Sequence, residues 1–326
     1  MLNLLKNNQT FVLILIPVVI LGLLTRSFLL PVQAIPNIDS HAMPLYRLVV
    51  LLAGNHAWLS RLIALLMFII QVLLIIKLNK DFILIEVRTY FHALIFILIG
   101  LSYTQLQQLH PVQFANIFIL LAISKIFNTY RNETLFTNFF DAAFFISTGS
   151  LFYFNTIFLF IIIWTGLIIM RQFSFREWLL TFTGFITPYL FSLAYFYIYS
   201  RIQDLFIMIQ SNFIFDKSYK IFNLYSVLYL IFLALIVILA SINILKKYNK
   251  MKIGIRKFYK FFFWMFVYSL AIFFATPVAS VEMLLITAIP LSFVYTNYLV
   301  SIKNEKSGNF LLLILIVLLV FMQIKG

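Results

Sequence analysis

The stretch FNLYSVLYLIFLALIVILASINIL, residues 222–245, contains no charged side chain. An α-helix needs about 20 apolar residues to cross the hydrocarbon core of a bilayer. Because lipid cannot hydrogen-bond to the backbone, such a stretch must satisfy its own peptide groups, as a helix does. The sequence therefore predicts a membrane-spanning helix at Phe222–Leu245, followed directly by a basic loop over residues 246–260.

The rest of the chain has the same character. Of its 326 residues, 63% are hydrophobic and 10% are charged, whereas soluble domains carry about 25% charged residues. This composition excludes a soluble globular fold and predicts an all-α, polytopic transmembrane helical bundle. The chain has no cysteine, which excludes disulfides, thiolate metal sites and cysteine nucleophiles.

Apolar runs separated by polar or basic segments predict about eleven spans, with the N-terminus in the cytoplasm. Val32-Gln33-Ala34 resembles a small-residue cleavage site, but the long apolar run before it and the spans after it favour a retained first helix. Two further helices, at 45–53 and 205–214, are expected to lie in the interface. The expected spans are 11–30, 58–76, 90–103, 112–129, 139–154, 156–170, 178–199, 222–245, 261–276, 281–300 and 310–322.

The basic residues are distributed unequally between the two sides that these spans define. Of the 24 lysines and arginines, most fall in loops assigned to the cytoplasm, as the positive-inside rule requires. Orientation thus accounts for most of the net charge of +14, and no nucleic-acid partner is expected. The loop 246–260 either serves orientation alone or also binds anionic lipid headgroups. The basic residues assigned to the outer side are Arg26, Arg47, Arg61, Arg201, Lys217, Lys220 and Lys325.

The first outer loop, residues 31–57, begins with the polar segment PVQAIPNIDSHAMPLYR, residues 31–47. Its Asp39 has two open interpretations: an N-cap of the helix that Pro44 begins, or a functional carboxylate. Asp39, His41 and His56 also offer ligands to a divalent cation, although their spacing fits no established metal motif.

Three later stretches carry a resemblance to known families: NIFILLAISKIFNTYR (116–131), DAAFFISTGSLFYFN (141–155) and RQFSFREWLLTFTGFITPY (171–189). Together with Asp39 in the first outer loop, they resemble the membrane core of C-type glycosyltransferases (GT-C), multi-span enzymes that use polyprenyl-phosphate-linked sugars. They resemble more closely a family of bacterial (Bacteroidota-type) multi-pass inner-membrane proteins with no established activity. The resemblance covers about residues 11–199.

This resemblance implies a bacterial cytoplasmic (inner) membrane location and two parts: a GT-C-like membrane core at 1–200, comprising the first seven spans, and a C-terminal membrane bundle at 201–326. It also implies roles. Asp39 matches the acid that acts as catalytic base, although Ser40 follows where the family commonly has a second acid. The cations nearest in sequence, which would bind the substrate phosphate, are Arg26, Arg47 and Arg61. Glu282 lies beyond the stretch that the resemblance covers. The predicted topology places it near the outer end of the tenth span, where it is either a carboxylate at a helix N-terminus or an acid facing an outer cavity.

Three functions are therefore weighed. The first is a glycosyltransferase-like enzyme that uses a polyprenyl-phosphate-linked sugar at the outer face. The second is a non-catalytic subunit or scaffold of an envelope biogenesis or export machine, with membrane-protein partners. The third is a lipid or sugar transporter or flippase. No row of acids is predicted at mid-membrane, where proton-driven transporters keep ionisable groups, so the transporter ranks last.

Overall fold

The computed structural model describes residues 5–6, 9–29, 42–54, 56–131, 137–171, 174–213, 224–275, 282–302 and 304–325, with residues 25–29, 131, 213, 324 and 325 described as backbone only. Within these ranges the regular structure is entirely helical, and none of the described residues forms a β-strand. The all-α class expected from the sequence is confirmed.

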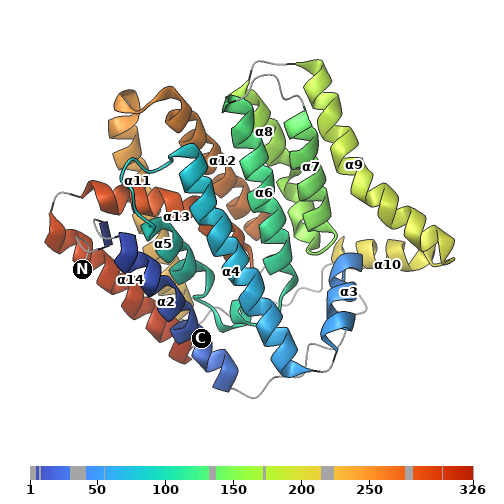
Figure 1. Cartoon of the computed structure of the whole chain (residues 1–326), viewed down its shortest axis with the longest axis horizontal. Helices are drawn as coiled ribbons and strands as arrows, with labels where there is room; N and C mark the ends of the chain where they lie inside the picture. Colours follow the sequence, from blue (N-terminus) through green and yellow to red (C-terminus); the bar gives the residue numbers. More distant parts are fainter. Residues whose placement is uncertain are drawn as a thin grey trace.

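The part of the chain up to residue 213 contains all the helices that line the groove described in the next subsection. It forms α2 (Gln9–Leu29), α3 (Pro44–Ala53), α4 (Ala57–Phe82), α5 (Phe91–Gly100), η1 (Thr104–Gln107), α6 (Pro111–Arg131), α7 (Thr137–Ser150), η2 (Phe154–Phe160), α8 (Ile161–Met170), α9 (Phe175–Ile198) and α10 (Ile202–Phe213). In Figure 1, α6, α7 and α9 stand side by side, and α10 turns away across the lower end of α9, close to α3.

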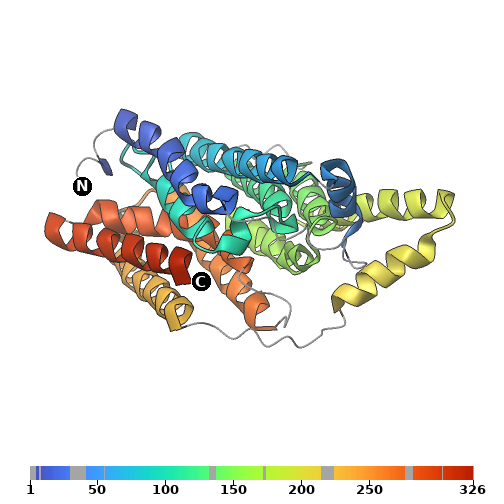
Figure 2. The ribbon, with the colours of Figure 1, turned by 90° about the horizontal axis from the view of Figure 1, so that it is seen from below.

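The remaining helices form the other side of the bundle. They are α11 (Leu224–Lys247), η3 (Tyr248–Lys250), α12 (Ile253–Ala275), α13 (Met283–Ser301) and α14 (Glu305–Lys325). Figures 1 and 2 place α11, α13 and α14 together with α2 and α5, at the opposite side from α9 and α10.

Within the described residues, seven helices are long and apolar enough to cross a membrane, namely α4, α6, α9, α11, α12, α13 and α14. This supports the membrane class that the composition predicts. The other four expected spans coincide with helices or helix pairs that are shorter or described only in part: α2, α5, α7 and the η2–α8 pair. Eleven spans and a cytoplasmic N-terminus thus stay predictions.

Helix α5 is much shorter than the span expected at residues 90–103. Its ten residues are all buried, and at 1.5 Å per residue they extend about 15 Å, half the thickness of the hydrocarbon core. The carbonyl of Leu101, just past its end, accepts hydrogen bonds from the side-chain amides of Gln107 at 3.1 Å and Gln323 at 2.8 Å. A helix can end at this depth because protein groups replace the missing backbone partners.

Helices α6, α7 and α9 pack closely through small residues. The Ser147 hydroxyl donates to the carbonyl of Phe185 at 2.6 Å, and the Ser150 hydroxyl lies 2.7 Å from that of Tyr189. The sequence Ser147-Thr148-Gly149-Ser150 therefore forms a helix-packing patch, as small residues do between membrane helices. On the facing helix, a Cβ atom added to Gly184 would lie 2.4 Å from the carbonyl oxygen of Phe140.

The loops separate into two ends of the bundle. At the end that we call the basic end, the Tyr259 hydroxyl donates to the carbonyl of Leu84 at 3.1 Å, and the Lys257 ammonium donates to that of Met170 at 2.9 Å. These bonds bring the α4–α5, α8–α9 and α11–α12 connections together. The opposite end, which we call the α3 end, contains the starts of α6 and α13 and the turn after α7.

We expect Gly184→Ala to destabilise the protein by about 1–3 kcal/mol, because the added methyl group must displace backbone rather than a flexible side chain. Thermal unfolding of the purified protein in detergent measures this. Gly22→Ala is the matched control, since a Cβ atom at that helical glycine would meet no atom within 4 Å. Equal melting temperatures for the two variants would contradict the close contact between α7 and α9.

Candidate functional site

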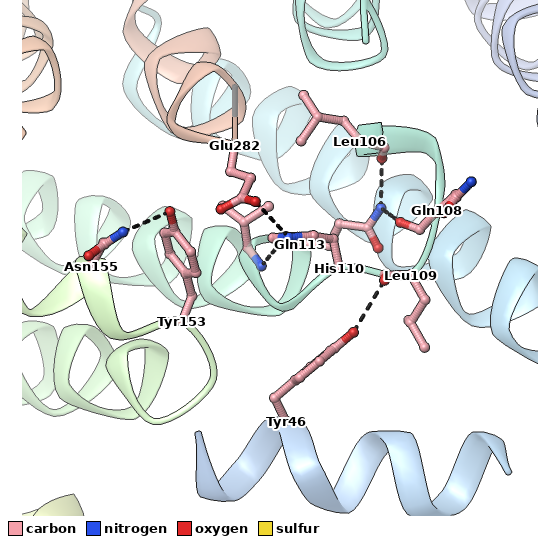
Figure 3. A network of polar contacts seen from close by, with 10 residues as sticks. Tyr46, Leu106, Gln108, Leu109, His110, Gln113, Tyr153, Asn155 and Glu282 are labelled. Atoms are coloured by element: carbon pink, nitrogen blue, oxygen red, sulfur yellow. Dashed lines mark hydrogen bonds and ion pairs between the residues drawn. The ribbon is translucent and has the colours of Figure 1, made fainter. Parts of the chain in front are cut away.

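The α3 end contains a hydrogen-bonded histidine–glutamate pair between two helix starts. His110 directly precedes α6, and Glu282 directly precedes α13. The Nε2 atom of His110 lies 3.0 Å from Oε1 of Glu282, and the two side chains are only 24% and 18% exposed. The pair is drawn in Figure 3. It joins two helices that lie far apart in the sequence.

The second ring nitrogen of His110 is also occupied. Its Nδ1 atom accepts a hydrogen bond from the backbone N–H of Val112 at 3.3 Å. A nitrogen that accepts carries no proton in neutral imidazole, so the network assigns the proton to Nε2, which donates it to Glu282. Both ring nitrogens of His110 are thus engaged, and His110 holds the Glu282 carboxylate in place.

Tyr153, in the turn after α7, completes this cluster. The side-chain amide of Asn155 donates to its phenolic oxygen at 3.0 Å, and its ring packs edge-on against His110 with centroids 6.2 Å apart. A tyrosine phenol is protonated at neutral pH, so Tyr153 presents a hydrogen-bond donor beside Glu282 (Figure 3).

Helix α3 is attached next to this cluster. The Tyr46 hydroxyl donates to the carbonyl of Leu109 at 3.2 Å, the residue before His110, as Figure 3 shows. The backbone N–H of Leu45 donates to the carbonyl of Leu151 at 3.1 Å. These bonds fix α3 against the start of α6 and the end of α7.

Next to the His110–Glu282 pair, a chain of hydrogen-bonded side-chain amides extends into the core. The side-chain amide of Gln71 donates to the backbone carbonyl of Gln113 at 2.9 Å, and that of Asn116 donates to the side-chain oxygen of Gln71 at 2.9 Å. All three side chains are fully or almost fully buried. They connect α4 with α6 at the depth of the middle of α4, without an ionisable group among them.

On its other flank, α3 borders an apolar groove that we call the α3–α9 groove. It has a volume of about 700 Å³ and lies between α3, α7, α9 and the turn before α10. Its walls include Leu48, Leu51, Phe191, Tyr195 and Phe196. A groove of this size and composition can hold the chain of a lipid.

Two arginines line this groove. Arg47 comes from the first turn of α3, and Arg201 follows the turn that ends α9. Both side chains are exposed, and among the described residues neither guanidinium has an acidic partner within ion-pair distance. A guanidinium presents paired N–H donors that match the oxygens of a phosphate. The groove therefore combines an apolar wall with two groups suited to an anionic headgroup.

The residues singled out in the sequence fall in different places. Arg47 lines the groove, and Glu282 belongs to the His110 cluster. Arg61, in the second turn of α4, is not among the groove-lining residues. His56 directly precedes α4.

Three predicted site residues are not tested by the structure. Arg26 lies on α2, but its side chain is not described, and Asp39 and His41 lie outside the described residues. The described part of the chain contains no group of three His, Asp or Glu side chains close enough to hold a metal ion. The proposed cation site at Asp39, His41 and His56 therefore stays a prediction.

Three contributors were not identified as site residues from the sequence: His110, Tyr153 and Arg201. No local motif surrounds them. The only usable signal was that each was expected near the outer end of a span, on the same side as Arg47 and Glu282. Comparison with protein-family models, curated proteins and solved structures finds no match for this chain.

We expect Glu282→Gln to lower the free energy of unfolding by about 1–2 kcal/mol, because the hydrogen bond from His110 to a charged carboxylate becomes a hydrogen bond between two neutral groups. Glu282→Leu should cost more, since the His110 N–H then loses its acceptor altogether. Thermal unfolding of both variants measures the loss. Glu86→Gln, at an exposed carboxylate of the basic end, is the charge-matched control and should be neutral. A Glu282→Leu variant as stable as this control would show that the pair does not fasten α6 to α13.

Proposed function

We propose that this protein is a membrane-embedded transferase of the C-type glycosyltransferase kind, which binds a polyprenyl-phosphate-linked sugar in the α3–α9 groove at the outer face of a bacterial inner membrane. The observation that carries the proposal is the α3–α9 groove, which has a volume of about 700 Å³, mostly apolar walls, and Arg47 and Arg201 among its lining residues. A polyprenyl phosphate has the matching chemistry, with a long hydrocarbon chain attached to an anionic group.

The proposed binding mode divides the lipid between two kinds of contact. The isoprenoid chain lies against apolar side chains such as Leu48 and Phe191, which are 49% and 71% exposed. The phosphate lies between the two guanidinium groups, each able to donate two hydrogen bonds to it. Placing the phosphate there also puts the sugar beside α3, because Pro44 and Arg47 of α3 form part of the groove wall.

The proposed reaction transfers the sugar to an acceptor hydroxyl. The hydroxyl oxygen attacks the anomeric carbon, the bond from that carbon to the phosphate oxygen breaks, and polyprenyl phosphate leaves with the bonding electron pair. Asp39 takes the proton of the hydroxyl as general base, and the arginines stabilise the negative charge on the leaving phosphate. Asp39 precedes Pro44 by five residues, a chain length that reaches at most about 18 Å.

In this proposal the His110–Glu282–Tyr153 cluster has a positioning role. It fastens the starts of α6 and α13, and Tyr46 fastens α3 to the residue before His110. Helix α3, which carries Arg47, is therefore fixed to the start of α6 on the side away from the groove. One oxygen of the Glu282 carboxylate accepts a hydrogen bond from His110.

The arginines can be tested by binding alone. We expect Arg47→Gln and Arg201→Gln each to weaken the binding of a fluorescent polyprenyl phosphate by about three- to tenfold, with a larger loss in the double variant. Purified full-length protein in nanodiscs of neutral lipid provides the measurement. Lys80→Gln, at an exposed lysine of the basic end, is the control. If the arginine variants bind like this control, the groove is not the phosphate site.

The same assay tests whether the other two candidate cations, Arg61 and Arg26, bind the phosphate. Arg61 does not line the groove, so Arg61→Gln should bind like the Lys80→Gln control. Arg26→Gln tests the remaining arginine, whose side chain lies outside the described part of the structure. A loss of binding confined to these two variants would move the phosphate site away from the α3–α9 groove.

Asp39→Asn tests the catalytic step separately. A general base typically contributes 10²–10⁴-fold to the rate, so we expect transfer to fall by at least about a hundredfold while polyprenyl phosphate binding is unchanged. Envelope glycan analysis of cells that produce the variant at wild-type protein levels measures the loss. A normal glycan profile would refute the catalytic role. Combined with intact arginine-dependent binding, it would favour a non-catalytic lipid-binding subunit of an envelope machine.

A further inference from the structure

A second concave site lies at the basic end, away from the α3–α9 groove. It is a slot of about 260 Å³ between α11, α12 and α13, lined among others by Ser241, Leu245, Tyr248, Lys260, Phe263 and Pro290. Ligand pockets for drug-sized molecules have volumes of about 300–1,000 Å³. The slot is therefore smaller than a typical cofactor site and suits a narrow, flexible chain.

The slot has a polar end and an apolar end. Tyr248 and Lys260 lie near the loop between α11 and α12, whereas Val237 and Phe266 lie deeper along the same two helices. Six residues separate Lys260 from Phe266, about 9 Å along the helix axis. The side chains of Leu245 and Phe263 beside the slot are 70% and 53% exposed, so this face of the protein meets lipid.

The polar end is strongly basic. Between Asp216 and Glu282 the sequence contains no acidic residue, while residues 246–260 contain seven lysines and arginines. Lys260 is exposed, and no described acidic side chain lies within ion-pair distance of it. This charge selects an anionic occupant.

A second cation lies one turn before Lys260 on α12. The guanidinium of Arg256 is 5.4 Å from the centre of the Tyr248 ring, which itself lines the slot. Residues four apart in a helix share a face, so Arg256 and Lys260 lie on the same side of α12. By contrast, the Lys257 ammonium donates to the carbonyl of Met170 and lies 5.0 Å from the Tyr130 ring centre, which gives it a structural role.

We propose that this slot binds one acyl chain of an anionic phospholipid, whose phosphate lies between Lys260 and Arg256. The bilayer itself supplies such a ligand, and the slot runs along helix axes, as an acyl chain does beside a membrane protein. The site is separate from the substrate groove in position and in partner. The basic loop therefore has a specific lipid-binding role in addition to its effect on orientation.

Native mass spectrometry of the full-length protein from nanodiscs tests the proposal. With equal amounts of phosphatidylglycerol and phosphatidylcholine, we expect the wild-type protein to retain phosphatidylglycerol preferentially. A cation near a membrane surface contributes about 1 kcal/mol to binding anionic lipid, which corresponds to about fivefold. Lys260→Gln and Arg256→Gln should each reduce retention by about this factor, and Lys260→Arg should preserve it.

Lys252→Gln is the matched control, because it removes the same charge from an exposed position of the same loop that does not line the slot. Ser241→Phe fills the slot and should reduce retention although it changes no charge. Inorganic phosphate should not displace the lipid, since the acyl chain provides part of the binding.

Four results would overturn the proposal. The first is an equal loss in Lys252→Gln and Lys260→Gln, which would show a diffuse charge effect. The second is unchanged retention in Ser241→Phe, which would show that no chain occupies the slot. The third is equal retention of the two phospholipids, which would show that the site does not distinguish an anionic headgroup from a zwitterionic one. The fourth is displacement by inorganic phosphate, which would show an anion site without the lipid chain.

Discussion

The structure depends on one constraint: inside a bilayer, every backbone polar group must find its partner within the protein. The short helix α5 shows how this is met. The helix is only about half as long as the hydrocarbon core is thick. The carbonyl of Leu101, just past its end, accepts hydrogen bonds from the side-chain amides of Gln107 and Gln323. Because α2, α4 and α13 contact this helix, its end is enclosed by protein. The chain then leads from α5 through η1 to His110 and the start of α6.

Close packing of small residues positions the groove. Gly184 of α9 lies almost against the carbonyl of Phe140, and Ser147 and Ser150 bond to the same helix. Helices α7 and α9 are therefore in contact along one face, while their other sides remain open toward α3. The α3–α9 groove occupies this opening, and Pro188, inside α9, is one of its lining residues.

The class of protein could be predicted from composition, and most helices from apolar runs between polar loops. Helix lengths were less predictable, since α5 is apolar throughout yet only ten residues long. Its end depends on amides from other parts of the chain, one of them Gln323. The candidate site was predictable only in part. Arg47 was singled out from the sequence as a candidate phosphate ligand. Arg201 was not, because only the packing of α9 beside α3 places it in the same groove as Arg47.

The sequence by itself determined that this chain is helical and membrane-embedded, because long uncharged stretches such as 222–245 have no other stable structure in lipid. It also determined that basic residues gather in particular loops. The tertiary structure decided which side chains meet, including His110 with Glu282 and Arg47 with Arg201 across one groove. The physical reason is that neighbours and rotation of membrane helices are set by close side-chain packing, and no local pattern records that packing.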